Sequence, residues 1–159
     1  MVIFVSVGTH KQQFDRLLRV IDELIEKKVI REKVFAQIGY SIYKPKKFKY
    51  KKFLGLTEFD KNIKKCDVFI THGGEGNIGT ALQYEKRMIV VPRRKKFDEH
   101  TNDHQLELTN AIGKEKQAVI VEDVNEIKKA LKGIAKLKIN RTPHASGIIK
   151  LIETELNNL

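Results

Sequence analysis

The sequence has little of the chemistry that marks secreted or membrane-spanning proteins. It has one cysteine, Cys66, so an internal disulfide is impossible, and the apolar segment beside it predicts an inert core thiol. No apolar run approaches the ~20 residues that a membrane-spanning helix needs. The first eight residues are too short for a signal peptide and lack a basic leader, so they are predicted to form a strand. These features favour the cytosol.

Length and charge define the kind of domain and the kind of partner. The 159 residues are 41% hydrophobic, enough for one domain over residues 1–159 with a real core, and too few for two ordinary domains. The formal net charge is +11 and the sequence pI is about 9.7. Such a charge favours polyanionic partners, which are nucleic acid, anionic lipid headgroups or phosphorylated substrates.

Apolar segments rich in β-branched residues alternate with segments of helical spacing. Strands are predicted at residues 2–7, 33–38, 49–54, 68–71, 88–91 and 118–121. Helices are predicted at residues 14–28, 57–66, 77–85 and 101–114, and two more begin after Asp123 and Ser146. Thr57 and Asp123 each precede an acid by three residues, the pattern of a capping box. The alternation predicts an α/β fold, a Rossmann-like doubly wound parallel sheet.

The most informative segment runs from Asp67 to Asn77, where an apolar strand stops at the sequence His-Gly-Gly-Glu-Gly. Glycine lets a backbone approach a ligand where a Cβ would collide. The free N–H groups of the following helix favour an anion such as phosphate. The segment is not a P-loop, because no Gly-Lys-Ser/Thr follows, and its place in mid-chain argues against a dinucleotide fingerprint. A tight strand-to-helix turn without a ligand is the alternative interpretation.

Three segments are predicted to meet at one edge of the sheet. Ligands of open α/β sheets bind outside the carboxyl ends of the strands. The segments at such ends are Gly8-Thr9-His10, residues 72–77, and the loop after Val91 that leads to Asp103-His104-Gln105. The chain is therefore expected to build one site from several strand ends.

An ordered series of motifs over nearly the whole chain resembles the C-terminal domain of glycosyltransferase family 28. The motifs lie at residues 4–10, 13–17, 37–39, 43–45, 70–77, 81–82, 88–93, 100 and 103–108. The stand-alone form of this domain is the most similar. It is the donor-binding subunit of two-subunit transferases, found in eukaryotic N-glycan assembly and in bacterial capsule or exopolysaccharide synthesis.

The resemblance implies the C-terminal half of a GT-B glycosyltransferase, which binds a UDP-sugar as donor. In this family the glycine loop and the next helix hold the diphosphate and ribose, and the Asp-His-Gln segment lines the pocket. The binding residues that it implies are Gly8, Thr9, His72, Gly73, Gly74, Glu75, Gly76, Asn77, Thr80, Arg93, His104 and Gln105.

Three positions depart from the family pattern. Asn77 stands where serine is frequent, Glu85 stands near a usual glycine, and Thr80 stands where an acid is thought to hold the ribose. Glu75 or Glu85 is a candidate substitute for that acid. No Asp-x-Asp metal motif is present, so neither a metal nor another cofactor is expected. Basic side chains, Arg93 or Arg94, with the helix N-terminus, would then stabilise the departing UDP in place of a metal.

The resemblance also implies a partner, because a complete GT-B enzyme has two Rossmann-like domains and this chain has room for one. The partner would be a membrane-attached subunit that binds a lipid-linked saccharide acceptor, and this protein would lie in the cytoplasm at the inner face of the membrane. The transferred sugar would be N-acetylglucosamine or galactose. The catalytic base would come from the partner or from His10, for which a polar turn residue is the alternative.

Other residues have both a structural and a functional interpretation. His72 either contacts substrate or bonds to backbone at a strand end. His100 and His104 are four residues apart, which would place both on one helix face, but no third metal ligand is evident. The apolar stripe of the last helix, with Ile148, Ile152 and Leu156, either covers the sheet or contacts the partner.

A lysine cluster at residues 44–53 supports a different class of function. It interleaves six lysines with aromatic residues. It is the basis of an alternative hypothesis, a non-enzymatic binding module for RNA, with bases stacked on rings, or for anionic lipid. A solvated edge with inward aromatics is the third interpretation. Attraction to lipid fits a partner of a membrane protein better than nucleic-acid binding does.

Overall fold

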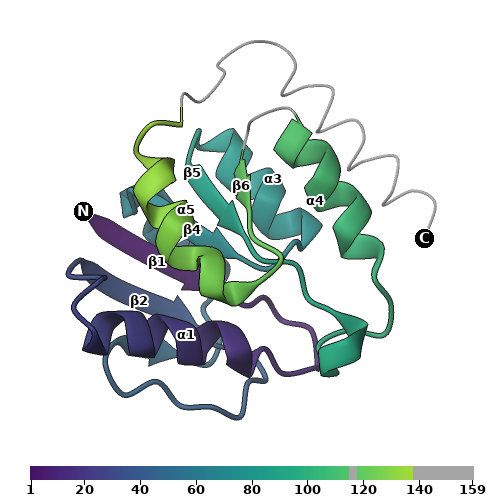
Figure 1. Cartoon of the computed structure of the whole chain (residues 1–159), viewed down its shortest axis with the longest axis horizontal. Helices are drawn as coiled ribbons and strands as arrows, with labels where there is room; N and C mark the ends of the chain where they lie inside the picture. The colour runs from purple at the N-terminus through teal and green to yellow at the C-terminus, as the bar shows by residue number, and fades with distance from the viewer. Residues whose placement is uncertain (115–117, 138–159) are drawn as a thin grey trace.

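Six parallel strands form one sheet whose order places a crevice at its centre. The computed structural model describes residues 1–114 and 118–137 (Figure 1). Its elements are β1 (Val2–Ser6), α1 (Asp15–Glu26), β2 (Lys33–Gln37), β3 (Lys49–Lys51), α2 (Leu56–Lys65), β4 (Val68–Thr71), α3 (Glu75–Gln83), β5 (Arg87–Val90), η1 (Lys95–Phe97), α4 (His104–Lys114), β6 (Ala118–Ile120), η2 (Val124–Glu126) and α5 (Ile127–Ile134). The strand order is β3-β2-β1-β4-β5-β6. The direction of winding reverses between β1 and β4, which leaves a crevice at the carboxyl edge there.

Alternate side chains of the strands build two cores, one on each face of the sheet. Ile3 and Ile70 point to the face covered by α1 and α5, which lies toward the viewer in Figure 1. Phe4, Phe69 and Met88 point to the opposite face and pack with residues of α2, α3 and α4. The predicted doubly wound sheet is thus confirmed. Because helices cover both faces, the edges of the sheet are left for ligands.

Several predicted helix starts are wrong by one to three residues. α2 begins at Leu56 after Gly55, which makes no side-chain cap, so Thr57 does not open a capping box. α3 begins at Glu75, two residues early, and α4 begins at His104 rather than at residue 101. Asp123 does accept a hydrogen bond from the Asn125 N–H, although a 3-10 turn precedes α5. The helix predicted after Ser146 lies outside the described residues.

A buried carboxylate fixes the loop that begins the lysine cluster. Asp22 of α1 is almost fully buried, and its oxygens accept hydrogen bonds from the Tyr43 hydroxyl (2.7 Å), the Lys46 N–H (2.7 Å) and the Lys47 N–H (2.9 Å). The hydrogen bond from Tyr43 to Asp22 raises the pKa of Tyr43 to about 12. Asp22 therefore organises a surface loop from inside the protein.

The aromatic residues of the lysine cluster divide between core and surface. Phe48 and Tyr50 are half-buried and pack against the α1 side of the core, which confirms the inward interpretation for both. Phe53 differs, since it is 41% exposed and its ring meets Tyr40 at 5.1 Å. The interleaved rings thus do not form one stacking platform for nucleic-acid bases.

Two smaller expectations concern Cys66 and membrane spans. Cys66 is buried, and its burial raises the pKa of the thiol to about 11, as expected of an inert core cysteine. None of the helices in residues 1–114 and 118–137 has the length and apolar character to cross a bilayer.

Changing Asp22 to Asn tests the anchoring of this loop. Asparagine keeps one acceptor but presents an N–H₂ group toward one of the three donors. We expect the free energy of unfolding to fall by about 2–3 kcal/mol, since hydrogen bonds to charged groups are worth about 1.5–3 kcal/mol each. Urea unfolding followed by circular dichroism measures the change. The control is Glu23→Gln, at the exposed neighbour in α1; equal loss in both variants would contradict the anchoring role.

Candidate functional site

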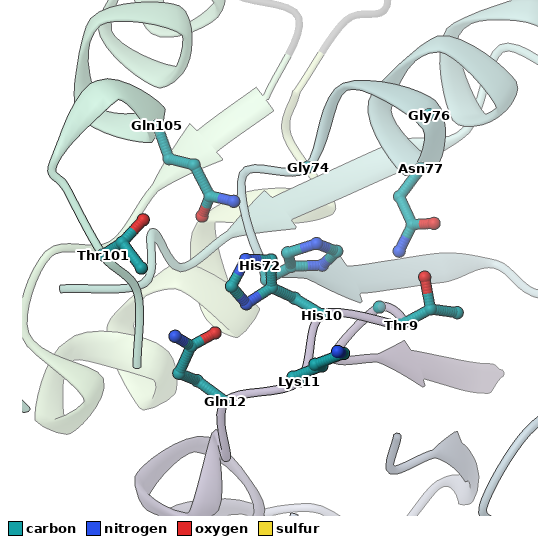
Figure 2. A pocket seen from close by; sticks show the side chains of 11 residues that line it. Thr9, His10, Lys11, Gln12, His72, Gly74, Gly76, Asn77, Thr101 and Gln105 are labelled. Carbon is teal, nitrogen blue, oxygen red and sulfur yellow. The ribbon is translucent and has the colours of Figure 1, made fainter. Parts of the chain in front are cut away.

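A cavity of about 710 Å³ lies at the carboxyl edge of the sheet, where β1 and β4 end (Figure 2). Its lining comes from the loop after β1 (Gly8, Thr9, His10, Lys11, Gln12), from the β4–α3 segment (His72, Gly74, Gly76, Asn77) and from the approach to α4 (Thr101, Gln105). The three segments that the sequence predicted to converge do lie together. The cavity sits at the point where the winding of the sheet reverses.

The imidazole of His72 fills the space between two glycines. His72 follows β4 and is buried. A Cβ added to Gly8 or to Gly74 would overlap the His72 ring, and Gly8 also has a positive φ of 77°. Gly73 is crowded by Thr109 and Gln105 of α4. Close packing within the protein therefore explains these three glycines without any ligand.

Burial keeps His72 uncharged. Desolvation, followed by the charge of Arg93, lowers the pKa of His72 to about 3. Its Nδ1 lies 3.4 Å from Thr71 Oγ1, which in turn donates to the Ser6 carbonyl. The ring is thus a neutral, fixed wedge beneath the cavity at neutral pH.

The N-terminus of α3 faces the cavity with its first turn. Gly74 is the N-cap and no side chain caps the helix, and the first N–H groups of any α-helix lack intrahelical acceptors. Asn77 Nδ2 donates to Ser6 Oγ (3.0 Å) and to Thr71 Oγ1 (2.9 Å), which ties α3 to the ends of β1 and β4. The Asn77 amide protons are therefore used inside the protein, and its backbone N–H is the group left for an anion.

Two of the expected binding residues, Thr80 and Glu75, lie outside the cavity lining. Thr80 Oγ1 donates to the Gly76 carbonyl (2.9 Å), one turn along α3. Glu75 opens α3 and is not among the lining residues. His104 begins α4, and its side chain lies outside the described part of the structure.

Arg93 lies behind the cavity rather than in it. Its side chain is completely buried, and NH1 donates to the carbonyls of Gln12 (2.9 Å), Gln13 (3.1 Å) and Glu99 (2.9 Å). NH2 donates to the Val7 carbonyl (2.6 Å). The prediction that Arg93 contacts the diphosphate directly is therefore not supported, because its guanidinium is buried and bonded to backbone carbonyls. Arg93 instead clamps the loop after β1 to the loop after β5.

Arg94 is also engaged elsewhere, so another cation faces the cavity. Arg94 forms ion pairs with Asp103 (3.8 Å) and Glu122 (3.5 Å). Lys11 is the exposed basic residue among the lining residues. Sequence reasoning missed Lys11, although its position directly after Gly8-Thr9-His10 was the signal that could have found it.

His10 stacks on a histidine that comes from the other side of the cavity. The ring centroids of His10 and His100 are 4.6 Å apart, with planes inclined by 23°. Burial, His100 and Arg93 all lower the pKa of His10. The buried atoms His10 Nδ1 and Gln12 Oε1 have no hydrogen-bond partner in the described structure. His10 is therefore a neutral imidazole at neutral pH, with Gln12 beside its ring.

The position of His100 removes the basis for a two-histidine metal pair on one helix face. α4 begins at His104, so His100 belongs to the preceding loop. Within residues 1–114 and 118–137, no group of three His, Cys, Asp or Glu side chains is placed to hold a metal ion. The contact of His100 is with His10, a pairing that sequence spacing did not reveal.

Comparisons with known proteins identify a family and several similar folds. A family model described as "Glycosyltransferase family 28 C-terminal domain" matches residues 2–152. No curated protein matches the chain in sequence. Similar solved structures include the glycotransferase of kitacinnamycin (19% identity, TM-score 0.63, 99% of this chain, 39% of that chain) and spinosyn forosaminyltransferase SpnP (14%, 0.62, 99%, 39%). A third is glycosyltransferase VinC in complex with DTDP (15%, 0.55, 98%, 37%).

These likenesses define the fold and the extent of the match. At such low identities the solved structures show a shared fold alone. The chain spans 39% of each of the first two solved chains. The family match, which covers almost the entire chain, is the stronger finding.

Changing Arg93 to Lys tests the clamp behind the cavity. A lysine ammonium cannot reach four carbonyls spread over two loops, so buried acceptors lose their donors. We expect a loss of about 3–5 kcal/mol in the free energy of unfolding, as for other broken buried charge networks. Urea unfolding measures it, with Arg94→Lys as control. A change below about 1 kcal/mol in the Arg93 variant would contradict the clamp.

Acid unfolding tests the neutral state of His72. Its pKa is about 3 when folded and about 6.5 when unfolded, so the unfolded chain binds more protons between these values. Stability is therefore complete above pH 6.5 and falls as the pH drops, by about 2 kcal/mol at pH 5. His72→Gln should lose less between pH 6.5 and 5 in urea unfolding. Equal losses in both proteins would show that His72 is not buried neutral.

Proposed function

The chain belongs to the glycosyltransferase family 28 C-terminal domain family, and from this membership we propose that its cavity binds a UDP-sugar, the donor of a glycosyl transfer. The diphosphate lies at the N-terminus of α3. The loop that carries Lys11 and the first turn of α4, which carries Gln105, flank the rest of the donor. A volume of about 710 Å³ falls within the usual range of about 300–1,000 Å³ for ligand sites.

Gly76 is the observation that carries the proposal. Unlike Gly8, Gly73 and Gly74, it has no protein atom within 4 Å of the place where a Cβ would stand. It lines the cavity in the first turn of α3. A residue without a side chain at an uncapped helix N-terminus leaves room for a phosphate to reach the N–H groups.

The proposed reaction breaks the bond between the anomeric carbon and the β-phosphate oxygen, and it joins that carbon to an acceptor oxygen. Negative charge grows on the departing UDP. The α3 N–H groups and the positive end of the helix dipole are placed to stabilise that charge, together with Lys11, an exposed cation that lines the cavity. The proposal assigns this role to protein groups and needs neither a metal nor a cofactor.

The proton of the acceptor hydroxyl must also leave. We assign its removal to His10 or to a group of the partner. His10 suits the task because it lines the cavity and its lowered pKa keeps the imidazole neutral. His100 holds the ring by stacking.

The ribose contact is assigned to the start of α3. Glu85 follows the end of α3, about 13 Å from its first turn at 1.5 Å per residue, which is too far from the phosphate end. The Thr80 hydroxyl is already bonded to the Gly76 carbonyl. Glu75, at the first helical position, is the acid nearest to the proposed diphosphate.

We propose that a second, membrane-attached subunit supplies the acceptor-binding half. The resemblance to stand-alone donor-binding subunits supports this proposal. The acceptor would be a lipid-linked saccharide, and the transferred sugar would be N-acetylglucosamine or galactose. The reaction would take place at the cytoplasmic face of the membrane.

Two glycines of α3 form a matched pair for testing donor binding. Gly76→Ala places a methyl group in the proposed diphosphate position. Gly79→Ala adds a methyl group about one turn later in α3, away from that position. Both have open space, so both should fold and gain helix propensity alike. We expect isothermal titration calorimetry with UDP to show at least a tenfold loss of affinity in Gly76→Ala and little change in Gly79→Ala.

Two outcomes would contradict the proposed function. One is the absence of UDP binding to the wild-type chain with or without its partner subunit. The other is an equal affinity of the two alanine variants, which would place the nucleotide away from the N-terminus of α3.

A further inference from the structure

The exposed apolar side chains gather at the edge of the sheet that holds the cavity. The large exposed hydrophobic residues of the described chain are Met1, Tyr40, Ile42, Phe53, Leu56 and Phe97. All but Met1 follow the carboxyl ends of strands. Four of them come after β2 and β3, at one side of the sheet. The opposite edge, where strands begin, has only Met1 among them.

Positive charge is concentrated in the same part of the chain. Residues 40–65 contain nine lysines and two acids, a net charge of +7 within a total of +11. Lys47 pairs with Glu26 (3.2 Å) and Lys51 pairs with Glu58 (2.8 Å). The other seven lysines have no acidic partner within 4.0 Å in residues 1–114 and 118–137. This region is therefore basic and apolar at once.

Two groups of these residues, one around Tyr40 and one along α2, make up the surface that we name the β2–β3 patch. Lys52 lies 5.7 Å from the centre of the Tyr40 ring, which packs on Phe53. Leu56 lines a hollow of about 680 Å³ together with lysines of the outer side of α2. The patch consists of Tyr40, Ile42, Phe53, Leu56, Lys52, Lys61, Lys64 and Lys65.

We propose that the β2–β3 patch docks onto the anionic lipid headgroups of a bilayer. Ile42 is 78% exposed and Leu56 is 91% exposed, so both can enter the boundary between headgroups and acyl chains. Lysines beside them stay at the level of the headgroups, with their stems along apolar surface. A basic surface gains from each lysine near an anionic leaflet.

An anionic bilayer fits the patch better than RNA does. Bases stack on aromatic faces, but Phe48 and Tyr50 are turned into the core. The most exposed residues, Ile42 and Leu56, are aliphatic and offer no stacking surface to a base. Aliphatic side chains beside lysines are the composition of a membrane-surface segment.

Docking at this place would bring the cavity to the membrane. The backbone of Gly39, at the end of β2, packs against Gly8 of the cavity, since a Cβ on Gly39 would overlap the Gly8 carbonyl. The patch thus adjoins the first loop of the site. Delivery of a lipid-linked acceptor to the cavity rests on the proposed function, whereas the docking itself does not.

Vesicle sedimentation of the full chain tests the proposal. The probes are vesicles of phosphatidylcholine alone and of phosphatidylcholine mixed with phosphatidylglycerol. We expect binding to the mixed vesicles only, weakened by salt. The double variant Ile42→Ser/Leu56→Ser should bind at least fivefold more weakly. The triple variant Lys52→Gln/Lys61→Gln/Lys65→Gln should bind at least tenfold more weakly.

A charge-matched control separates the patch from net charge. Lys128→Gln/Lys129→Gln/Lys132→Gln removes three exposed lysines of α5, on the other face of the sheet. We expect it to bind mixed vesicles nearly as the wild type does. All variants should bind UDP like the wild type in calorimetry, so a failure of lipid docking and a failure of the proposed function remain distinguishable.

Four results would overturn the proposal. They are no binding to mixed vesicles, equal loss in the patch and control triple variants, full binding by Ile42→Ser/Leu56→Ser, and a patch occupied by another partner. An RNA partner would appear as a gel shift of RNA that is equally strong with the wild type and with Ile42→Ser/Leu56→Ser. A second copy of the chain would appear as a wild-type dimer that is a monomer in this variant. In either of these two cases, the wild-type protein would not sediment with the mixed vesicles.

Discussion

The buried guanidinium of Arg93 is the constraint on which the site depends. It joins carbonyls of Val7, Gln12, Gln13 and Glu99, so the loops after β1 and β5 share one charged anchor. Parallel strands supply loop starts at one edge but do not fix the loops relative to one another. A side chain with five donors in a rigid fork does so, because each carbonyl that it binds loses rotational freedom. The cavity is therefore as rigid as this anchor.

The glycines around the cavity serve two different physical purposes. Gly8 and Gly74 are required by the His72 ring, which would overlap a Cβ at either place. Gly76 has no such neighbour, although it stands only two residues beyond Gly74. The first two glycines of the His-Gly-Gly-Glu-Gly segment thus allow close packing, whereas the third leaves open space at the cavity. Only the last of its glycines points to a ligand by itself, because packing against His72 explains Gly74 and packing against α4 explains Gly73.

The sequence predicted what depends on local pattern and missed what depends on distant contacts. Alternating strands and helices were enough for the parallel sheet, and a sheet of that kind brings its carboxyl ends together. The stack of His10 on His100 joins residues 90 positions apart, and no spacing rule reports such a contact. Arg93 resembles a phosphate ligand in sequence because arginine is suited to both phosphate and backbone carbonyls. Only its burial distinguishes the two roles.

Charge and protonation are divided between different groups of the site. A protonated His10 would attract a diphosphate, but it could not accept a proton from an acceptor hydroxyl. Burial and the charge of Arg93 favour the neutral ring. The positive potential comes instead from groups that do not titrate near neutral pH, which are the α3 N–H groups and Arg93, whose pKa burial lowers only to about 10. The cation that anchors the loops thus also keeps both imidazoles unprotonated near neutral pH.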